Sequence, residues 1–263
     1  MSELQEIGCF LLDMDGTFYL GDELLPGALR FIEVIRRQGR DFLFMTNNSS
    51  QHSESYARKI TRLGLPISAE KVFTSGEATA IYLARLHPEA RIYLVGTPAL
   101  EEEFAAHGFV LTDASPDFAV LAFDTTLTYE KLWKLCDFVR AGVLYVATHP
   151  DLNCPTLQGF MPDIGAMIAF VKAATGCVPK VIGKPHREMV EAVTERMGLP
   201  ESNLCMVGDR MYTDIALGDE SGITTVLVLT GETHLEDIES SPYMPDYVFR
   251  DLNALADALE REE

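Results

Sequence analysis

Apolar and polar residues alternate along this chain in two patterns that predict two kinds of element. Segments with an apolar residue at every third or fourth position, such as residues 27–39 and 53–64, predict amphipathic helices. Short continuous apolar runs, typical of strands buried on both faces, occur at residues 8–12, 41–45, 71–75, 203–208, 224–229 and 246–249. Such strands in alternation with helices predict an α/β fold with a doubly wound parallel sheet covered on both faces.

The middle of the chain repeats this alternation independently. Its strand-like runs and helix-like segments are residues 91–96, 101–108, 117–123, 129–142 and 143–148. The charged strand-end loops described below all lie outside this region, which is long enough for a small α/β domain of its own. We therefore predict a core domain of residues 1–79 and 182–263, interrupted by an inserted α/β domain of residues 80–181.

The 263 residues include 40 acidic and 21 basic side chains, and the net charge of −19 argues against a nucleic-acid or anionic-membrane surface. A small anionic ligand stays compatible with this charge, because a bound cation and one lysine can reverse the local field. The five cysteines are odd in number and lack a Cys-x-x-Cys pair, as expected of reduced thiols in a cytoplasmic protein. The acidic residues 1–8 do not resemble a signal peptide, and no apolar run is long enough to span a membrane.

Polar residues of unusual chemistry follow four of the predicted strands, at the edge where a doubly wound sheet forms its ligand crevice. In the first loop, DMDGT, Asp13 and Asp15 point to the same side while the chain stays extended. Two carboxylates about 4 Å apart repel each other by roughly 4 kcal/mol at an effective dielectric of about 20. The pair is tolerated if a cation lies between them or if one stays protonated. A calcium loop matches poorly, because Phe18 stands where that loop needs a glycine.

The second loop, TNNSS, is a weaker signal by itself. Thr46 ends a predicted strand, and Asn47 and Asn48 follow it shortly before a helix that begins near Ser53. A hydroxyl and free backbone N–H groups near a helix start can bind an anion. A simple helix cap explains the same residues equally well.

The third and fourth loops are also ambiguous when each is taken alone. Lys184, in GKP, precedes Pro185, which suits the first turn of the helix expected next, and a surface lysine is the ordinary interpretation. Asp209, in GDRMYTDI, ends an apolar strand, and a helix is expected to open at Thr213 or Asp214 with a capping side chain. Because four such signals stand at four strand ends, we predict that they form one shared site.

These residue types together suit phosphoryl transfer. Few carboxylate ligands in an open coordination sphere favour Mg²⁺, and the ion, a lysine, a hydroxyl and backbone amides can surround a transferring phosphoryl group. A carboxylate is ionised at pH 7, so one aspartate can attack phosphorus without a base and form an aspartyl-phosphate that water cleaves. The second aspartate can protonate the leaving alkoxide and later take a proton from water, a double role that needs a raised pKa.

The motifs DMDGT, TNN, GKP and GDRMYTDI, in this order, resemble the signature set of the haloacid dehalogenase (HAD) superfamily of phosphohydrolases. The longer stretches DMDGTFYLGDELLPGA, FMTNNSS and ATHPDLNCP, with the central insertion, resemble its subclass IIA, the NagD-like or p-nitrophenyl-phosphatase-like sugar phosphatases. The resemblance covers nearly the whole chain. It implies a Rossmann-like core with an inserted α/β cap of the C2 type, and a Mg²⁺-dependent enzyme for small phosphate monoesters such as sugar phosphates.

The resemblance also implies a role for each motif residue. Asp13 would be the nucleophile and a Mg²⁺ ligand, and Asp15 would be the general acid and base and a ligand through its backbone carbonyl. Asp209 would bind Mg²⁺ through its carboxylate, and Asp214 would orient the surroundings of the metal through water or Lys184. The phosphate would be held by Thr46, Asn47, Asn48 and Lys184.

One stretch of the expected cap departs from the pattern of the family. Relatives often carry Asn where ATHPD has His149, so the resemblance does not by itself identify the particular substrate of this chain. The candidate contacts with the leaving group are His149, Asp151, Asn153 and Asp163. The alternative for these four residues is a role in loop structure alone.

Other functions stay open on the sequence. A phosphomutase would have to keep water from its aspartyl-phosphate, whereas a dehalogenase would need neither Mg²⁺ nor Asp15. A phospho-accepting switch protein, like a receiver domain, also has acidic residues, Thr and Lys at strand ends, but it lacks a long insertion. An inactive ligand-binding module is disfavoured because every catalytic position is filled. The expected partner is a small phosphorylated metabolite, and a homodimer is an open alternative to a monomer.

Overall fold

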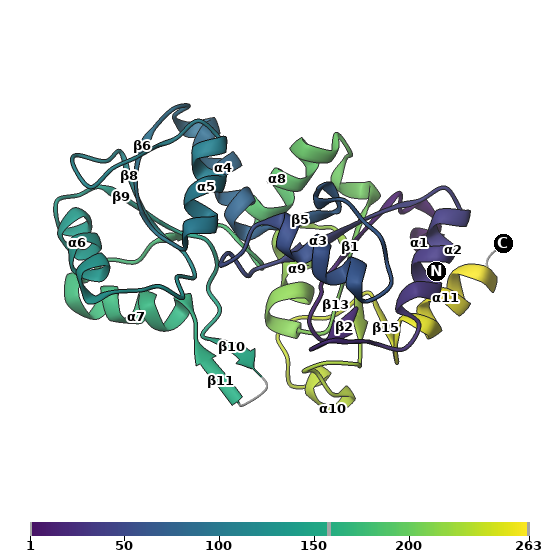
Figure 1. Cartoon of the computed structure of the whole chain (residues 1–263). Coiled ribbons are helices and arrows are strands. Elements are labelled where there is room, and N and C mark those ends of the chain that lie inside the picture. The colour runs from purple at the N-terminus through teal and green to yellow at the C-terminus, as the bar shows by residue number, and fades with distance from the viewer. Residues whose placement is uncertain (1, 157–158, 262–263) are drawn as a thin grey trace. The chain divides into compact units, whose positions relative to one another are not determined.

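The structure, a computed structural model, describes residues 2–156 and 159–261. The chain packs as two compact units, and it crosses between them four times (Figure 1). Unit 1 comprises Met1–Thr46, Ser53–Phe73 and Lys184–Glu263, and unit 2 comprises Asn47–His52 and Thr74–Gly183. The division into an inserted domain of residues 80–181 within a core of residues 1–79 and 182–263 stays a prediction.

Unit 1 alternates strands with helices. Its elements are α1 (Ser2–Glu6), β1 (Cys9–Leu12), β2 (Tyr19–Leu20), β3 (Glu23–Leu24), α2 (Ala28–Arg37), β4 (Asp41–Thr46), α3 (Ser53–Arg62), η1 (Ala69–Lys71), β5 (Val72–Thr74, whose last residue belongs to unit 2), α8 (Arg187–Met197), η2 (Glu201–Asn203), β13 (Leu204–Gly208), η3 (Met211–Ile215), α9 (Ala216–Ser221), β14 (Thr224–Val228), α10 (Leu235–Ile238), β15 (Tyr247–Phe249) and α11 (Leu252–Arg261).

The main sheet of unit 1 has the strand order β15-β14-β13-β1-β4-β5. β1 pairs in parallel with β13 on one side and β4 on the other, and β14 pairs in parallel with β13 and β15. The strands that follow β1 in the chain, β4 and β5, lie on one side of it, and the later strands β13, β14 and β15 lie on the other side. Such a reversal of strand order leaves a crevice beyond the carboxyl ends of the central strands, where ligands bind in folds of this type.

The core of unit 1 explains why its central strands are apolar throughout. Every residue of β1 and β13 is buried, as expected of parallel strands covered on both faces. Aromatic rings fill the space around β1 and β4, with Phe18 packed edge-on against Phe44 at a centroid distance of 4.7 Å. The prediction of a parallel-sheet α/β fold is confirmed.

Unit 2 has a separate sheet with the parallel strand order β12-β9-β8-β6-β7. In Figure 1, α6 and α7 lie on one side of this sheet, and α4 and α5 lie on the other. The elements are α4 (Ser75–Leu86), β6 (Arg91–Val95), α5 (Pro98–Ala106), β7 (Val110–Leu111), β8 (Phe118–Leu121), α6 (Tyr129–Arg140), β9 (Leu144–Ala147), β10 (Asn153–Thr156), β11 (Gly159–Pro162), α7 (Ile164–Thr175) and β12 (Lys180–Val181). β10 and β11 form an antiparallel hairpin.

Two predicted helix starts differ from the structure. Pro185 was expected in the first turn of a helix, but α8 begins at Arg187 and Pro185 lies before its N-cap residue, His186. A helix was expected to open at Thr213 or Asp214, but the helical turn η3 already begins at Met211 and continues into α9. In the second case Asp214 accepts a hydrogen bond from the backbone N–H of Arg210, the N-cap residue of η3, and its other carboxylate oxygen contacts Lys184.

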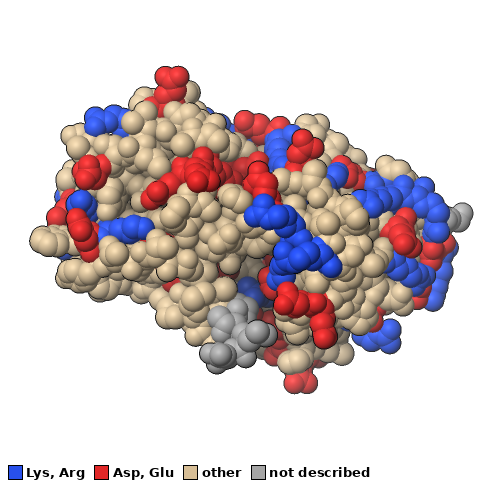
Figure 2. All heavy atoms as spheres, viewed as in Figure 1, with Lys and Arg blue, Asp and Glu red and all other residues tan. Residues whose placement is uncertain are grey.

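The surface is charged with both signs, and Figure 2 shows Asp and Glu side chains beside Lys and Arg on the face in view. Among the described residues, no helix combines the length and the apolar character needed to cross a bilayer.

Candidate active site

Three side chains from strand-end loops of unit 1 form one acidic cluster. Asp13 follows β1, Asp209 follows β13, and Asp214 lies in η3. One carboxylate oxygen of each lies within 4.8 Å of one oxygen of each of the others. We call these three residues the acidic cluster. The structure thus brings together two aspartates that are far apart in the sequence, as the crevice argument requires, and it adds Asp214 as a close third.

Lys184 bridges two members of the acidic cluster. Its Nζ donates to Asp13 Oδ1 at 2.6 Å and to Asp214 Oδ1 at 2.6 Å, and it lies 3.3 Å from the carbonyl oxygen of Met45. Burial alone would lower the pKa of Lys184, but the charges of Asp13 and Asp214 outweigh burial and hold the pKa above its ordinary value. The ammonium group is therefore charged at neutral pH and fixes one oxygen of Asp13.

Asp209 is held by a hydrogen bond at each carboxylate oxygen. Thr17 Oγ1 donates to Oδ1 at 3.1 Å, and the backbone N–H of Glu232 donates to Oδ2 at 2.7 Å. Two glycines leave room for this carboxylate. A Cβ atom at Gly231 would lie 1.9 Å from Asp209 Oδ2, and one at Gly16, where φ is +93°, would lie 2.5 Å from the same oxygen. Any larger residue at either position would displace the carboxylate.

Asp214 is fixed by the π-helical turn η3, an element that often marks a functional site. Its Oδ2 accepts a hydrogen bond of 3.1 Å from the backbone N–H of Arg210, while Oδ1 faces Lys184. A Cβ atom at Gly208 would lie 2.2 Å from Asp214 Cγ, so the last residue of β13 has to be glycine for the turn to pack here. The glycine of the GDRMYTDI motif is thus explained by the position of Asp214.

The acidic cluster carries more negative charge than Lys184 balances. Burial raises the pKa of Asp13, Lys184 opposes this increase, and the charges of the other two aspartates add to it, so the pKa lies well above its usual value. Burial and the charge of Asp214 likewise raise the pKa of Asp209. A divalent cation among these oxygens would stabilise the ionised carboxylates. The donor chemistry and the excess charge therefore fit a hard divalent ion.

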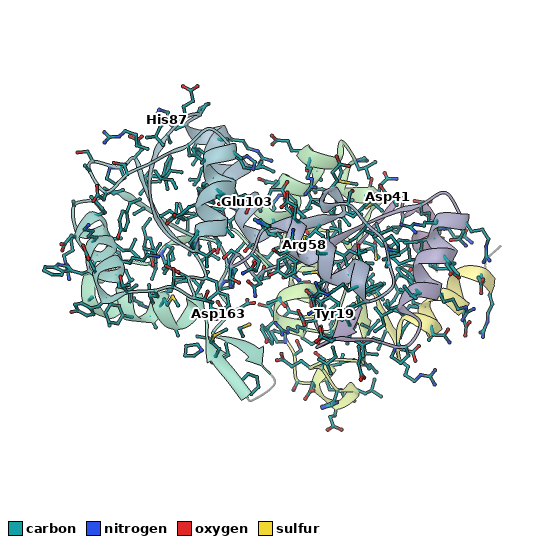
Figure 3. The ribbon with its side chains drawn as sticks, viewed as in Figure 1. Tyr19, Asp41, Arg58, His87, Glu103 and Asp163 are labelled. Atoms are coloured by element: carbon teal, nitrogen blue, oxygen red, sulfur yellow. The ribbon has the colours of Figure 1, made fainter. Side chains whose placement is uncertain are left out.

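Asp15 lies two residues after Asp13, and its side chain contacts Tyr19. The hydroxyl of Tyr19, labelled in Figure 3, donates to Asp15 Oδ2 at 3.3 Å, and Lys59 Nζ lies 3.8 Å from the centroid of the Tyr19 ring. Desolvation by the surrounding protein raises the pKa of Asp15, while Lys59 and the Tyr19 hydroxyl act in the opposite direction. A carboxyl group with a raised pKa can donate a proton and later accept one.

The predicted phosphate loop divides between the two units. Thr46 is the last residue of β4 in unit 1, and the carbonyl of the preceding Met45 faces Lys184. Asn47 and Asn48 begin the segment that belongs to unit 2. Asn48 Oδ1 accepts hydrogen bonds from the backbone N–H and the hydroxyl of Ser50, which fold the segment into a local turn. The phosphate-binding role of these residues stays a prediction.

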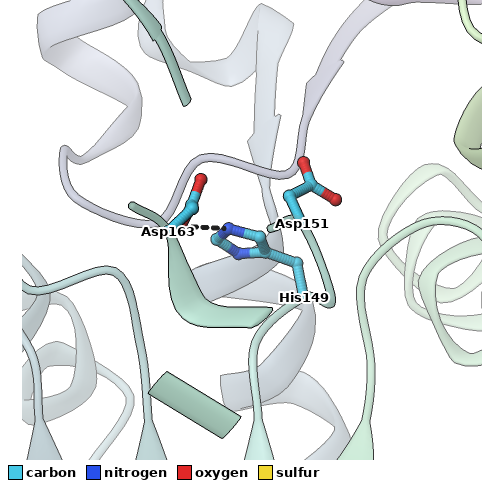
Figure 4. A group of neighbouring side chains, drawn as sticks. All are labelled: His149, Asp151 and Asp163. Carbon is cyan, nitrogen blue, oxygen red and sulfur yellow. Dashed lines mark hydrogen bonds and ion pairs between the residues drawn. The ribbon is translucent and has the colours of Figure 1, made fainter. Parts of the chain in front are cut away.

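The four candidate substrate contacts all lie in unit 2. Figure 4 shows His149, Asp151 and Asp163 side by side, with His149 Nε2 at 3.1 Å from Asp163 Oδ1. Asp163 is also the N-cap residue of α7, and its side chain accepts a hydrogen bond from the backbone of that helix. Asn153 is exposed at the start of β10, where it pairs with Pro162. Their contact with a substrate stays a prediction.

Sequence reasoning left two residues of this site without a role. Thr17 and Arg210 both stand inside the motifs DMDGT and GDRMYTDI, but only the structure shows what their side chains touch. Thr17 binds Asp209, and Arg210 Nε lies 3.1 Å from Glu232 Oε2. Burial would lower the pKa of Arg210, but the charges of Asp13 and Asp209 hold it above its ordinary value. Its guanidinium is a second cation beside the acidic cluster.

Comparisons with known proteins identify the family of this chain. The family profile of haloacid dehalogenase-like hydrolases matches residues 10–110, and a second HAD-hydrolase-like profile matches residues 181–255. The acid sugar phosphatase of Staphylococcus saprophyticus is 38% identical over 253 residues, which cover 96% of this chain and 98% of that protein.

Solved structures match the chain over nearly its whole length. The 4-nitrophenylphosphatase of Thermotoga maritima has a TM-score of 0.94 at 47% identity, covering 98% of this chain and 99% of that one. A glycerol phosphate phosphatase of Mycobacterium tuberculosis, solved in complex with magnesium, has a TM-score of 0.88 at 34% identity, covering 96% of this chain and 78% of that one.

Proposed function

This chain belongs to the haloacid dehalogenase-like hydrolase family, and we propose that it is a Mg²⁺-dependent phosphatase that hydrolyses small phosphate monoesters through an aspartyl-phosphate. The observation that carries the proposal is the position of Asp13, held by Lys184 at 2.6 Å within the acidic cluster at the carboxyl end of β1. The relatives named as phosphatases of sugar phosphates, nitrophenyl phosphate and glycerol phosphate support the same class of reaction.

Mg²⁺ is the proposed cofactor. Asp13 and Asp209 would bind it through their carboxylates, Asp15 through its backbone carbonyl, and Asp214 would stand close by. When bound, the ion would neutralise charge on the phosphoryl group and on the carboxylates. A relative that was solved with magnesium and the excess negative charge of the acidic cluster both support this assignment.

In the first half of the proposed reaction, an oxygen of Asp13 attacks phosphorus and the bond between phosphorus and the leaving oxygen breaks. Lys184 holds the other carboxylate oxygen, so the attacking group is oriented before the substrate arrives. Asp15 donates its proton to the leaving alkoxide, which departs as an alcohol. The products of this half are the alcohol and a phosphoryl group on Asp13.

In the second half, a water molecule attacks the phosphorus of the aspartyl-phosphate. Asp15, now ionised, takes a proton from this water, and the bond between phosphorus and the Asp13 oxygen breaks. Inorganic phosphate leaves, and both aspartates return to their starting state. The phosphoryl oxygens would be held throughout by Thr46, Asn47, Asn48 and Lys184.

Unit 2 is proposed as the C2-type cap that selects the leaving group. Of the contacts predicted from the sequence, His149, Asp151, Asn153 and Asp163, the exposed Asn153 keeps this role. The hydrogen bonds of the other three support a different role, which is argued below. A sugar phosphate is the favoured substrate class, and p-nitrophenyl phosphate is the expected test substrate. The cytoplasmic location, the lack of a nucleic-acid partner and the homodimer stay predictions from the sequence.

The proposal is tested by measuring phosphate release from sugar phosphates, nucleotides, pyridoxal phosphate and p-nitrophenyl phosphate, with Mg²⁺ and with a chelator. We expect hydrolysis of p-nitrophenyl phosphate and of at least one metabolite, lost with the chelator and restored by Mg²⁺. Transfer of the phosphoryl group without release of phosphate would indicate a phosphomutase, and an aspartyl-phosphate that persists for minutes would indicate a switch protein. Hydrolysis that resists the chelator would remove the metal from the mechanism.

A further inference from the structure

Three of the crossings between the units carry residues that meet in unit 2. Asn47 directly follows Thr46 in the chain, Ser75 lies just after the crossing at Thr74, and Gly183 directly precedes Lys184. Asn47 and Ser75 belong to a group of side chains around His149, and Gly183 packs against the same group. We call this group the His149 network and define it as Asn47, Ser75, Thr148, His149, Asp151 and Asp163, of which all but Asp151 are buried.

His149 is the centre of this network. Its Nε2 lies 3.1 Å from Asp163 Oδ1, and because an ionised carboxylate only accepts, the ring proton of this pair lies on Nε2. Its Nδ1 faces the hydroxyls of Thr148 at 3.1 Å and Ser75 at 3.3 Å. The ring is fully buried, so both of its nitrogens are engaged inside unit 2. Nδ1 is therefore an acceptor for the Thr148 hydroxyl, and Ser75 lies beside it in the same buried group.

Ser75 connects this buried group to the predicted phosphate loop. Its hydroxyl donates a short hydrogen bond to the carbonyl oxygen of Asn47. In a planar trans peptide the N–H points opposite to the C=O, so fixing the Asn47 carbonyl also fixes the direction of the Asn48 N–H. The Asn48 N–H is one of the amides that the proposed function assigns to the phosphate.

Asp151 holds the same loop through a second contact. Asn47 Nδ2 donates to Asp151 Oδ1 at 2.9 Å, and the backbone carbonyl of Asp151 accepts from the N–H of Gly165 at the start of α7. The loop is thus tied at the Asn47 carbonyl and at the Asn47 side chain.

Gly183 shows how closely these parts pack. A Cβ atom at this position would lie 2.6 Å from the carbonyl oxygen of Thr148, 2.7 Å from Asn47 Oδ1 and 2.9 Å from His149 Cβ. The residue before Lys184 is therefore packed against the residue after Thr46. The two segments of unit 2 that directly follow Thr46 and directly precede Lys184 in the chain are therefore packed together within unit 2.

Two other functions of this group are disfavoured by the same contacts. Ser75, His149 and Asp163 follow one another like a nucleophilic triad, but the Ser75 proton is donated to a backbone carbonyl and its hydroxyl is fully buried. His149, Asp151 and Asp163 lie close enough to hold an ion, yet His149 Nε2 is hydrogen bonded to Asp163, and Asp151 accepts from Asn47. These contacts hold the side chains of the group in fixed positions and do not present a reactive atom.

We propose that the His149 network positions the amides of the Asn47–Asn48 loop for phosphate binding, so that Asp151, His149 and Ser75 are positioning residues and not contacts of the leaving group. This inference rests on the proposed function, because the loop has a task only if the protein binds phosphate. Such residues affect every phosphate ligand alike, whatever its leaving group. A leaving-group contact would instead change the preference among esters.

Asp151 is the best site for the test, because it is only partly buried and its replacement leaves the centre of the network intact. In the Asp151→Ala variant the inhibition constant of inorganic phosphate should rise about tenfold, the loss expected for one hydrogen bond to a charged group. The ratio of kcat/KM for an aryl and an alkyl phosphate should stay as in the wild type. Asp151→Asn keeps an oxygen that accepts from Asn47 and should restore phosphate affinity. Asp137→Ala, an exposed aspartate on α6, is the matched control.

A double-mutant cycle tests whether Asp151 acts through Asn47. If it does, Asp151→Ala should add little to the increase that Asn47→Ala alone causes in the inhibition constant of phosphate. Ser75→Ala should raise that constant independently, because it releases the Asn47 carbonyl. Melting temperatures of all variants report whether each one is folded.

The outcomes separate this inference from the proposed function. A changed ratio between the two esters with an unchanged phosphate constant would make Asp151 a substrate contact and overturn the inference. A lower melting temperature with unchanged kinetics would reduce the network to a structural role and also overturn it. Wild-type protein that hydrolyses no phosphate ester at all would refute the proposed function, and the inference with it.

Discussion

Lys184 Nζ lies 2.6 Å from Asp13 Oδ1, although the two residues are 171 positions apart in the chain. Asp13 directly follows the first strand of unit 1, and Lys184 is the residue at which the chain returns to that unit. The contact joins the two halves of unit 1 at the carboxyl end of its sheet. It also combines the proposed nucleophile with a cation that favours its ionised form.

Replacement of Lys184 by methionine should reduce turnover by at least about 100-fold and lower the melting temperature. The variant leaves Asp13 and Asp214 buried without the cation that both contact, a change that is costly for folding and for binding phosphate. Steady-state kinetics and thermal denaturation check this. Lys172→Met, at an exposed lysine on α7, should leave both quantities unchanged. Equal behaviour of the two variants would contradict the role of Lys184.

Asp13→Asn should abolish turnover and preserve the fold. The neutral amide is a poor nucleophile, so kcat should fall by more than about 1000-fold. Because the substitution removes a charge from a crowded acidic cluster, the melting temperature in metal-free buffer should be equal to or above that of the wild type. A large loss of melting temperature in that buffer would show that the cluster is not under electrostatic stress.

Asp15→Asn should slow alkyl phosphates more than activated aryl phosphates. The aryl leaving group departs as a stable anion and needs little protonation, whereas an alkoxide needs a proton from Asp15. The measurement is the dependence of kcat/KM on the pKa of the leaving alcohol, which should steepen in the variant. Tyr19→Phe, which removes the hydrogen bond to Asp15 while keeping the buried ring, should steepen it to a smaller extent. Equal slowing of all esters would count against the proton-transfer role.

The fold and the acidic residues of the site could be predicted from the sequence because local patterns encode them. The apolar runs that became β1, β4 and β13 end in polar residues, and strand order alone brings such ends together. The turn η3 could not be predicted, because its π-helical start depends on Asp214 packing over Gly208. The helix propensities of the residues in η3 carry no information about that contact.

The His149 network could also not be predicted from the sequence. Ser75 and His149 are 74 positions apart, and His149 and Asp163 are 14 apart, with no periodic pattern to relate them. Sequence reasoning identified His149 and Asp163 as candidate contacts with the leaving group, and it did not relate them to each other or to Ser75. Their partners became visible only in the structure, where His149, shortly after β9, lies beside Ser75 at the start of α4.

Gly231→Ala should weaken the metal site without touching a catalytic side chain. The added methyl group would lie 1.9 Å from Asp209 Oδ2, so the carboxylate has to move from its bond with the Glu232 N–H. The Mg²⁺ concentration for half-maximal activity should rise by about tenfold or more. Gly8→Ala is a matched control, since its nearest neighbour would be Asn203 Nδ2 at 3.4 Å. An unchanged Mg²⁺ requirement in Gly231→Ala would argue that Asp209 is not a ligand.

The stability of the metal-free protein should fall as the pH rises. The pKa of Asp13 is raised from 3.8 to about 8 and that of Asp209 to about 6, mainly by burial. A carboxyl group with a raised folded-state pKa stabilises the fold below its unfolded pKa, and this contribution is lost as the pH rises through the folded value. The melting temperature in chelator should therefore decrease between about pH 5 and pH 8, and Mg²⁺ should remove most of the decrease. A flat or rising profile in chelator would contradict the assigned shifts.

The most direct test of the central claim is to trap the covalent intermediate. The wild-type protein is mixed with an activated aryl phosphate and Mg²⁺, quenched with acid within one turnover, digested, and analysed by mass spectrometry. The proposed mechanism predicts a phosphoryl group on the peptide that contains Asp13, assigned to that side chain and absent in Asp13→Asn. A phosphoryl group on a different residue, or normal turnover by Asp13→Asn, would contradict it.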